Sequence, residues 1–221
     1  MAATVNDPRQ ECVKSARHRI LRGGVASVGF VSTPLRDESP GYHHVVTRGN
    51  NKQSIYLEDR DREVFCLMLN RIARKYGWKI LAYCLMENHY HLLICVGEKG
   101  LSDGMCELNG GYATTFNATH GRVNHLFGKR FWNRRIKTDA SLWNVVRYIV
   151  QNPRRAGGKK PLEGYRWTSY ATTIGLAVAD IRLARNELLQ FFGRAETTAV
   201  DEFRVFCSAS AFGGPVRWQP P

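Results

Sequence analysis

The residues with the clearest chemical potential in this chain are His89 and His91, which stand one residue apart inside a strongly apolar stretch. Alternate residues of a β-strand point to the same face, so a strand here would place both imidazoles side by side. Two neutral imidazoles on one face can bind one divalent metal ion. The alternative is a pair of hydrogen-bonded surface histidines, but the apolar flanks favour a site, because polar rings on a buried strand are costly without a partner.

A second candidate is the pair Tyr148 and Asn152, which lie four positions apart in a stretch with helical spacing of apolar residues. Residues four apart share a face of an α-helix, whereas Gln151 falls further round the helix. A tyrosine hydroxyl can act as a nucleophile, and an amide oxygen can bind a metal. Together with the histidines, this pair suggests a metal-assisted tyrosine nucleophile acting on nucleic-acid phosphate, unless Tyr148 is simply a core aromatic.

The charge balance of the chain favours a polyanionic partner. There are 32 Lys and Arg residues against 19 Asp and Glu, a formal net charge of +13, and contacts to phosphates release counterions. Cations alternate with aromatic residues beside the Tyr148 helix, a pattern that suits single strands because unstacked bases can rest on rings. The residues expected to contact nucleic acid, the cations through phosphates and Trp132 through bases, are Lys129, Arg130, Trp132, Arg134, Arg135, Lys137, Arg154, Arg155, Lys159 and Lys160.

Cysteine usage and hydropathy predict a cytoplasmic protein. The six cysteines, at positions 12, 66, 84, 95, 106 and 207, form no Cys-x-x-Cys pair and mostly have apolar neighbours, which favours reduced thiols over zinc ligands or disulfides. No run of about eighteen apolar residues is present, so the sequence predicts neither a membrane span nor a membrane partner. We expect a basic chain of this kind to be associated with the nucleoid.

Hydrophobic periodicity predicts a β-α-β-β-α-β order in the central part of the chain. This order is typical of the ferredoxin-like (split β-α-β, RRM-like) fold, an α+β fold with a four- to five-stranded antiparallel sheet and helices on one face. The other face would remain open for substrate. The expected elements are a strand at 42–48, a helix from Asp59 or Asp61 to Tyr76, strands at 78–86 and 89–96 around a Glu87-Asn88 turn, a helix at 101–119, a strand at 130–138 and a helix capped by Asp139 or Ser141.

The same pattern divides the chain into three parts. Residues 1–39 have little apolar periodicity and are rich in Arg, Ser and Gly, so we expect a flexible basic tail. Residues 40–175 would form the catalytic domain, in which 161–175 returns along the sheet edge. Residues 176–221 carry two short helical patterns and would form a C-terminal helical extension.

Seven segments of the chain match the motifs of a known family in the family's order. They lie at residues 42–44, 48–51, 76–78, 83–93, 121–127, 148–157 and 167–170. The most specific are His-Tyr-His at 89–91, Tyr-x-x-x-Asn-Pro at 148–153 and Arg-Gly-Asn-Asn at 48–51. In these segments the chain resembles the REP-associated tyrosine transposases, which are HUH-class single-strand transposases with one catalytic tyrosine.

The resemblance implies an enzyme that cleaves DNA and transfers strands. Tyr148 would attack a scissile phosphate of single-stranded DNA, which gives a 5′-phosphotyrosine link and a free 3′-hydroxyl. His89 and His91, with Asn152 as the third ligand, would hold a divalent ion, Mg²⁺ or Mn²⁺. The ion would withdraw charge from the phosphate and orient it for attack.

The resemblance also implies the partner, which would be single-stranded or hairpin DNA of the REP type. Arg48, at the end of the first strand, and Asn50, in the loop after it, would add to the DNA contacts. The transposase would act as a monomer or a homodimer, because related enzymes place the tyrosine helix either in the same subunit or across a dimer.

Two other functions stay open at this point. A non-catalytic regulator could hold nucleic-acid hairpins on the same basic surface, and its function would survive replacement of His89 and His91 by alanine. A relaxase or replication-initiator-like nicking enzyme shares the histidine pair but acts at plasmid origins. Palindromes flanking the gene would favour the transposase, and a replication origin would favour the nicking enzyme.

Overall fold

A four-stranded antiparallel sheet forms the centre of the structure, a computed structural model that describes residues 37–98 and 100–209. Its strand order, β2-β3-β1-β4, is the order that a β-α-β-β-α-β chain adopts in the ferredoxin-like fold. The predicted fold class is confirmed. The strands are β1 (Gly41–Arg48), β2 (Lys79–Met86), β3 (His89–Val96) and β4 (Trp132–Ile136).

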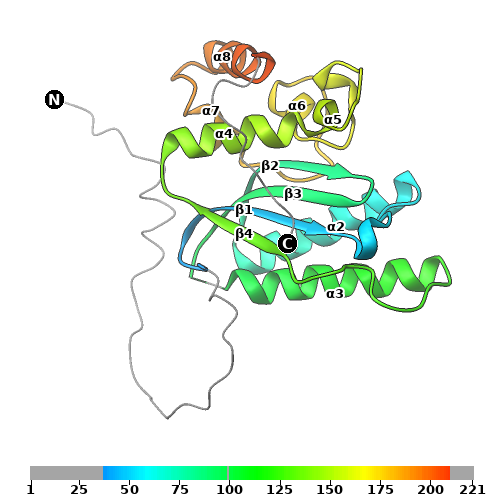
Figure 1. Ribbon diagram of the computed structural model, residues 1–221. Helices are drawn as coiled ribbons and strands as arrows, with labels where there is room; N and C mark the ends of the chain where they lie inside the picture. The colour runs from blue at the N-terminus through cyan, green and yellow to red at the C-terminus, as the bar shows by residue number, and fades with distance from the viewer. Residues whose placement is uncertain (1–36, 99, 210–221) are drawn as a thin grey trace, which may run out of the picture.

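Helices cover both faces of this sheet, as Figure 1 shows. Two long helices, α2 (Asp59–Tyr76) and α3 (Leu101–Thr119), pack on one face, and α4 (Asp139–Val150) crosses the other. All three helices were predicted from the sequence. The remaining elements are η1 (Asn50–Lys52), α5 (Asn152–Arg155), η2 (Leu162–Gly164), α6 (Tyr170–Thr173), α7 (Arg185–Leu189) and α8 (Glu196–Ser208).

The prediction of helices on only one face is wrong. Buried side chains form two clusters, one between the sheet and α2 with α3, and one between the sheet, α4 and the C-terminal helices. The cause lies in β2 and β3, which are buried at consecutive rather than alternate positions. Strands that are apolar throughout need cover on both sides. On the α4 face, exposed surface remains at β4, where Arg134 is exposed.

The helix α2 begins and ends close to the predicted residues. Its N-cap is Glu58, one position before Asp59, the first of the two predicted caps. Asp61 closes the capping box, because its Oδ2 accepts from the backbone amides of Leu57 (2.8 Å) and Glu58 (3.1 Å). Gly77 adopts a left-handed φ of 69° and ends the helix, as predicted.

The last strand and helix of the pattern differ from the prediction at their boundaries. The strand β4 is shorter than the predicted strand at 130–138. The N-cap of α4 is Thr138, whose hydroxyl oxygen accepts from the backbone amide of Ser141 (3.2 Å), rather than Asp139 or Ser141 itself. Three cap-type residues stand close together there, and the sequence alone does not select among them.

The return segment predicted at 161–175 pairs with the outer edge of β2. The backbone amide of Leu85 donates to the Trp167 carbonyl (2.8 Å), and that of Ser169 donates to the Tyr83 carbonyl (3.0 Å). These bonds satisfy edge groups of β2 that would otherwise need solvent or another chain.

Beyond the return segment, the helices α7 and α8 pack with α4 in one hydrophobic cluster. Both short helical patterns expected after residue 176 are therefore present. The division into a catalytic domain and an extension stays a prediction. The predicted tail 1–39 lies outside the described residues, apart from 37–39.

Four cysteines of the described residues agree with the expected reduced thiols. Cys66, Cys84 and Cys207 are buried free thiols, and Cys106 is an exposed one. Cys95 of β3 takes part in a disulfide, so the prediction is wrong at this residue, since connectivity cannot be read from spacing. Among the described helices, none has the length and apolar character needed to cross a bilayer.

The packing of α3 on the residue before β2 gives a stability test. A Cβ at Gly104 would lie 2.2 Å from Cζ2 of Trp78, whereas a Cβ at Gly110 in the same helix would meet nothing within 4 Å. We expect Gly104→Ala to lower the free energy of unfolding by about 1 to 3 kcal/mol. Gly110→Ala should raise it by roughly 0.5 to 1 kcal/mol, because alanine favours the helix. Urea denaturation measures both, and equal effects would contradict the packing.

Candidate active site

The register of β1 and β3 places the two histidines on the sheet face that α4 covers. His89 pairs with Arg48, and His91 pairs with Val46. Opposed residues of antiparallel strands point to the same face, and the ring centroids of His89 and His91 lie 5.0 Å apart. His91 is fully buried and His89 is half-buried. The rings therefore lie side by side, as strand alternation predicted, while their role as ligands stays a prediction.

Asn152 reaches both histidines from the start of α5. The predicted single helix is two helices, α4 and α5, which meet at Gln151. Nδ2 of Asn152 lies 3.2 Å from Nε2 of His91, and Oδ1 lies 3.4 Å from Nε2 of His89. Gln151 turns away and donates to the Cys207 carbonyl (2.7 Å). The amide that the sequence favoured is thus the one beside the histidines.

The donor atoms of this cluster fit one divalent cation. The Asn88 amide is oriented by its donation to the Lys52 carbonyl (3.0 Å), so its oxygen accepts from Nδ1 of His89 (2.7 Å). Neutral His89 then carries its hydrogen on Nδ1 and presents the Nε2 lone pair towards Asn152. Neighbouring ligands of an octahedral ion lie about 3 Å apart. The 3.4 Å between Oδ1 of Asn152 and Nε2 of His89 is close to this value.

A third histidine, His44 of β1, contacts the ring nitrogen of His91 that points away from Asn152. It is fully buried, and its Nε2 lies 3.1 Å from Nδ1 of His91, so the two rings share one hydrogen. A hydrogen on His91 Nδ1, donated to His44, leaves the Nε2 lone pair for a cation. His44 was not among the residues expected at the site. The sequence did hold a signal for it. His44 and Arg48 stand an even number of positions apart on one strand, so their side chains share a face of the sheet.

Burial keeps the three imidazoles uncharged at neutral pH. Desolvation lowers the pKa of His44 to about 3. Desolvation, and then the nearby Arg48 charge, lower the pKa of His89 to about 4. The pKa of His91 is held well below its ordinary value, again chiefly by burial. Neutral imidazole is the form that binds metal, so protons compete little for these nitrogens at pH 7.

Tyr148 lies directly beside this cluster and belongs to the same chain. Its half-buried ring lies 5.3 Å from that of His91, measured between centroids. The guanidinium of Arg155, which is exposed on α5 next to Arg154, lies 5.2 Å from the Tyr148 ring centroid. The pKa of Arg48 is lowered, chiefly by burial, and the charge interaction with Tyr148 acts in the opposite direction. The tyrosine is therefore within range of the histidines and of two guanidinium groups.

Five of the predicted DNA-binding residues converge on a cavity next to the cluster, which we call the Arg48 cavity. Its volume is about 450 Å³, and it lies where the end of β1, η1 and the loop before β4 meet. Its lining includes Arg48, Asn50, Lys129, Arg130 and Trp132. Trp132 also packs edge-on against His44, with 5.4 Å between ring centroids, so the cavity borders the histidine cluster.

The other cations predicted on and after β4 are spread more widely. Arg134 stands opposite His44 and is exposed on the same face. Arg135 points to the other face, where its guanidinium donates to the Pro40 carbonyl (2.9 Å). Lys137 precedes α4 and lies at the opposite end of that helix from the tyrosine. The structure brings Arg134 to the site, but neither Arg135 nor Lys137.

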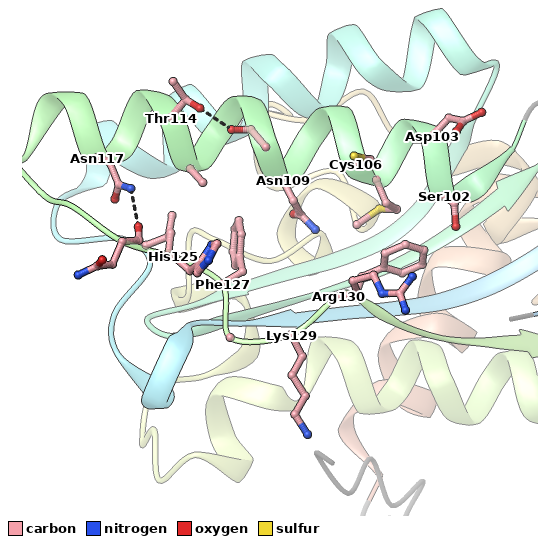
Figure 2. A pocket seen from close by; sticks show the side chains of 17 residues that line it. Ser102, Asp103, Cys106, Asn109, Thr114, Asn117, His125, Phe127, Lys129 and Arg130 are labelled. Atoms are coloured by element: carbon pink, nitrogen blue, oxygen red, sulfur yellow. Dashed lines mark hydrogen bonds between the residues drawn. The ribbon is translucent and has the colours of Figure 1, made fainter. Parts of the chain in front are cut away.

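A larger cavity lies on the α3 side of the sheet, away from the tyrosine. Its volume is about 780 Å³. Figure 2 shows its lining, in which polar side chains of α3 such as Asn109 and Thr114 stand across from loop residues such as His125 and Phe127. Because α4 covers the opposite face of the sheet, this cavity is not part of the histidine cluster.

A second group of potential metal ligands lies at the N-terminus of α2. Ligand atoms of Glu58, Asp61 and His120 lie within 4.8 Å of one another. Asp61 already accepts hydrogen bonds from two backbone amides and from Nε2 of His120 (2.8 Å). These oxygens therefore serve the helix cap, and the group lies on the face of the sheet opposite α4.

The chain belongs to the IS200-like transposase family, because the family model "Transposase IS200 like" matches residues 39–152. The match spans more than half of the 221 residues and includes His89, His91, Tyr148 and Asn152. At the level of the family, it implies DNA transposase activity. No curated protein matches the sequence significantly.

A solved structure shows the same fold, and two others align more weakly. A REP-associated tyrosine transposase bound to a REP hairpin aligns with a TM-score of 0.56 and 18% identity, over 70% of this chain and 96% of that chain. A candidate transposase from Deinococcus radiodurans R1 aligns at 0.39 with 13% identity, over 63% and 100%. The tRNA(His) guanylyltransferase of Saccharomyces cerevisiae aligns at 0.41 with 10% identity, over 84% and 85%. At TM-scores this low, the last two carry no argument.

The contact between His44 and His91 predicts an effect on metal affinity. We expect His44→Leu to weaken Mn²⁺ binding by about 10- to 100-fold, because His91 loses the group that holds its ring and its hydrogen. His43→Leu is the matched control, since His43 is equally buried but bonds to the Ser39 carbonyl (2.8 Å) on the other face of β1. Mn²⁺ titration followed by EPR measures both, and wild-type affinity in His44→Leu would contradict the assignment.

Proposed function

We propose that this protein is a divalent-metal-dependent transposase that cleaves and rejoins single-stranded DNA through Tyr148. The phenolic oxygen attacks the scissile phosphate, and the bond between phosphorus and the 3′-oxygen breaks. The 3′-oxygen leaves as a hydroxyl, which balances the hydrogen that the phenol loses. The DNA 5′ end stays on Tyr148 as a phosphodiester, so the reaction can reverse without ATP. The observation that carries this proposal is the contact of Tyr148 with His91, whose Nε2 faces Asn152.

We assign the cation to Nε2 of His89, Nε2 of His91 and Oδ1 of Asn152. When bound there, Mg²⁺ or Mn²⁺ withdraws charge from the scissile phosphate. Asn88 holds the His89 ring through Nδ1, and His44 holds the His91 ring through Nδ1. These outer contacts fix both ring orientations before DNA arrives, which lowers the cost of assembling the site.

Arg48 and Arg155 are assigned to the charge that develops on the reacting groups. A phenol is mostly protonated at neutral pH, so the attacking oxygen gains negative charge only as the reaction proceeds. Arg48 interacts electrostatically with Tyr148, and Arg155 lies against its ring. Guanidinium groups at these positions would stabilise the forming phenolate and pair with phosphate oxygens.

The DNA is proposed to be a hairpin with a single-stranded flank. The similar solved structure is that of a transposase bound to a REP hairpin, and the present chain carries a net charge of +13. The Arg48 cavity offers the ring of Trp132 beside Lys129 and Arg130, a combination that binds unpaired bases and their phosphates. We further propose that the protein acts in the cytoplasm at the nucleoid, with Tyr148 serving the histidines of its own subunit.

Removal of the phenolic oxygen tests the proposed nucleophile. Tyr148→Phe should abolish the covalent protein–DNA adduct completely, because the ring is kept and only the attacking oxygen is lost. DNA affinity should stay at the wild-type level. Tyr76→Phe is the control, since its hydroxyl bonds to Glu107 (3.1 Å) on the other side of the sheet and its loss should leave the adduct unchanged. The assay incubates each variant with Mn²⁺ and labelled REP-type hairpins that carry a single-stranded flank, followed by a denaturing gel.

Mass spectrometry of the adduct gives the outcome that would contradict this assignment. A nucleotide on a peptide without Tyr148, or an adduct that persists in Tyr148→Phe, would refute the nucleophile. Hairpin binding with no adduct in the wild type would favour the non-catalytic regulator.

A further inference from the structure

A cavity of about 830 Å³ borders the proposed active site at the point where α5 leaves it. Pro153 and Arg154 line it immediately after Asn152, and Met86 lines it three residues before His89. Its walls are therefore continuous with two of the residues assigned to the cation. We call it the Arg154 cavity, and the reaction described above does not use it.

The Arg154 cavity and the Arg48 cavity lie on opposite sides of the histidine strand. The strand β3 stands between β2 and β1 in the sheet. Met86, at the end of β2, lines the Arg154 cavity, whereas Arg48, at the end of β1, lines the Arg48 cavity. A strand of DNA that crosses β3 at His89 and His91, from the β1 side to the β2 side, would therefore meet one cavity on entering and the other on leaving.

The inner wall of the Arg154 cavity is largely apolar. Leu57 is 56% exposed there, and Met86 and Tyr165 are half-buried in the wall beside it. The Tyr165 ring is held in place because its hydroxyl donates to the Leu85 carbonyl (2.8 Å). A fixed ring and flat apolar surface can receive a base without a further cost in side-chain entropy.

The rim of the Arg154 cavity is cationic. Arg154, Lys159 and Lys160 line the cavity and are exposed. Gly158 brings the chain that carries both lysines back against α5, because its amide donates to the Pro153 carbonyl (2.9 Å) and a Cβ would lie 2.6 Å from that oxygen. The rim therefore keeps three positive charges at the edge of an apolar wall.

One acidic side chain of the lining adjoins this rim, and it is already engaged. Glu87 accepts a hydrogen bond from the hydroxyl of Ser54 (2.7 Å), which holds the carboxylate on the turn between β2 and β3. The charge of the cavity mouth thus stays positive, as phosphate requires.

We propose that the Arg154 cavity binds the nucleotides on one side of the scissile phosphate, while the Arg48 cavity binds those on the other side. This inference rests on the proposed function. Bases would lie on the wall at Tyr165 and Leu57, and phosphates would pair with Lys159 and Lys160. After cleavage only one DNA end is covalently held, and a second binding site keeps the other end near the phosphotyrosine for the reverse reaction.

The salt dependence of DNA binding tests this site with the full chain and an oligo(dT) probe of about sixteen nucleotides. We expect Lys159→Gln with Lys160→Gln to reduce the slope of log K against log salt by about 1.4, because each lost phosphate contact removes roughly 0.7. Arg71→Gln with Arg74→Gln removes the same charge from exposed positions of α2 and should leave the slope unchanged. Fluorescence anisotropy over a salt series measures both. An unchanged slope in the lysine variant, or equal losses in the two variants, would overturn the inference.

Photocrosslinking supplies the position of the strand. The same probe carrying 4-thiothymidine should crosslink to peptides containing Leu57 or Tyr165 as well as to the peptide containing Trp132. Crosslinks confined to the Trp132 peptide would also overturn the inference. A wild-type protein that forms no Tyr148 adduct would refute the proposed function, whereas an active enzyme with an unaltered slope in the lysine variant would refute only the second cavity.

Discussion

The contact of the Asn152 amide with Nε2 of His89 and Nε2 of His91 is the interaction on which the site depends. It joins two separately built parts of the fold. Strand register fixes the two rings on β3, and the change of direction at Gln151 aims the amide from α5. Both the Asn152 amide and Tyr148 lie beside the histidines only because α4 packs on the sheet through its apolar face. The packing of α4 is therefore a requirement of the chemistry as well as of stability.

The same contact belongs to a chain of polar groups that would otherwise be costly inside an apolar sheet. The chain runs from His44 through His91, Asn152 and His89 to Asn88. Hydrogen bonds join its members except at Oδ1 of Asn152 and Nε2 of His89, 3.4 Å apart, where a lone pair of the ring faces the oxygen. At its inner end, Nδ1 of His44 has no hydrogen-bond partner among the described residues. Each ring keeps a defined orientation while burial keeps it uncharged. A site built in this way is ready for a cation before DNA binds.

Local patterns predicted much of this arrangement, and long-range packing supplied the rest. The period of two in β3 and the Glu87-Asn88 turn are encoded within a few residues, so the strand boundaries and the side-by-side histidines followed from the sequence. The cover provided by α4 did not follow, since it depends on tertiary contacts. Strand alternation predicts that Arg134 and Arg135 point to opposite faces of the sheet. Which of them faces the histidines follows only from the pairing of β4 with β1. His44 was missed because its partner lies on another strand.

The position of Mn²⁺ in a crystal of the full chain tests the metal site most directly, through an anomalous difference map. We predict a peak roughly 2.0 to 2.3 Å from Nε2 of His89, Nε2 of His91 and Oδ1 of Asn152. A peak confined to the carboxylates around Asp61, with none between the two histidines, would contradict the assignment of the cation and with it the proposed mechanism.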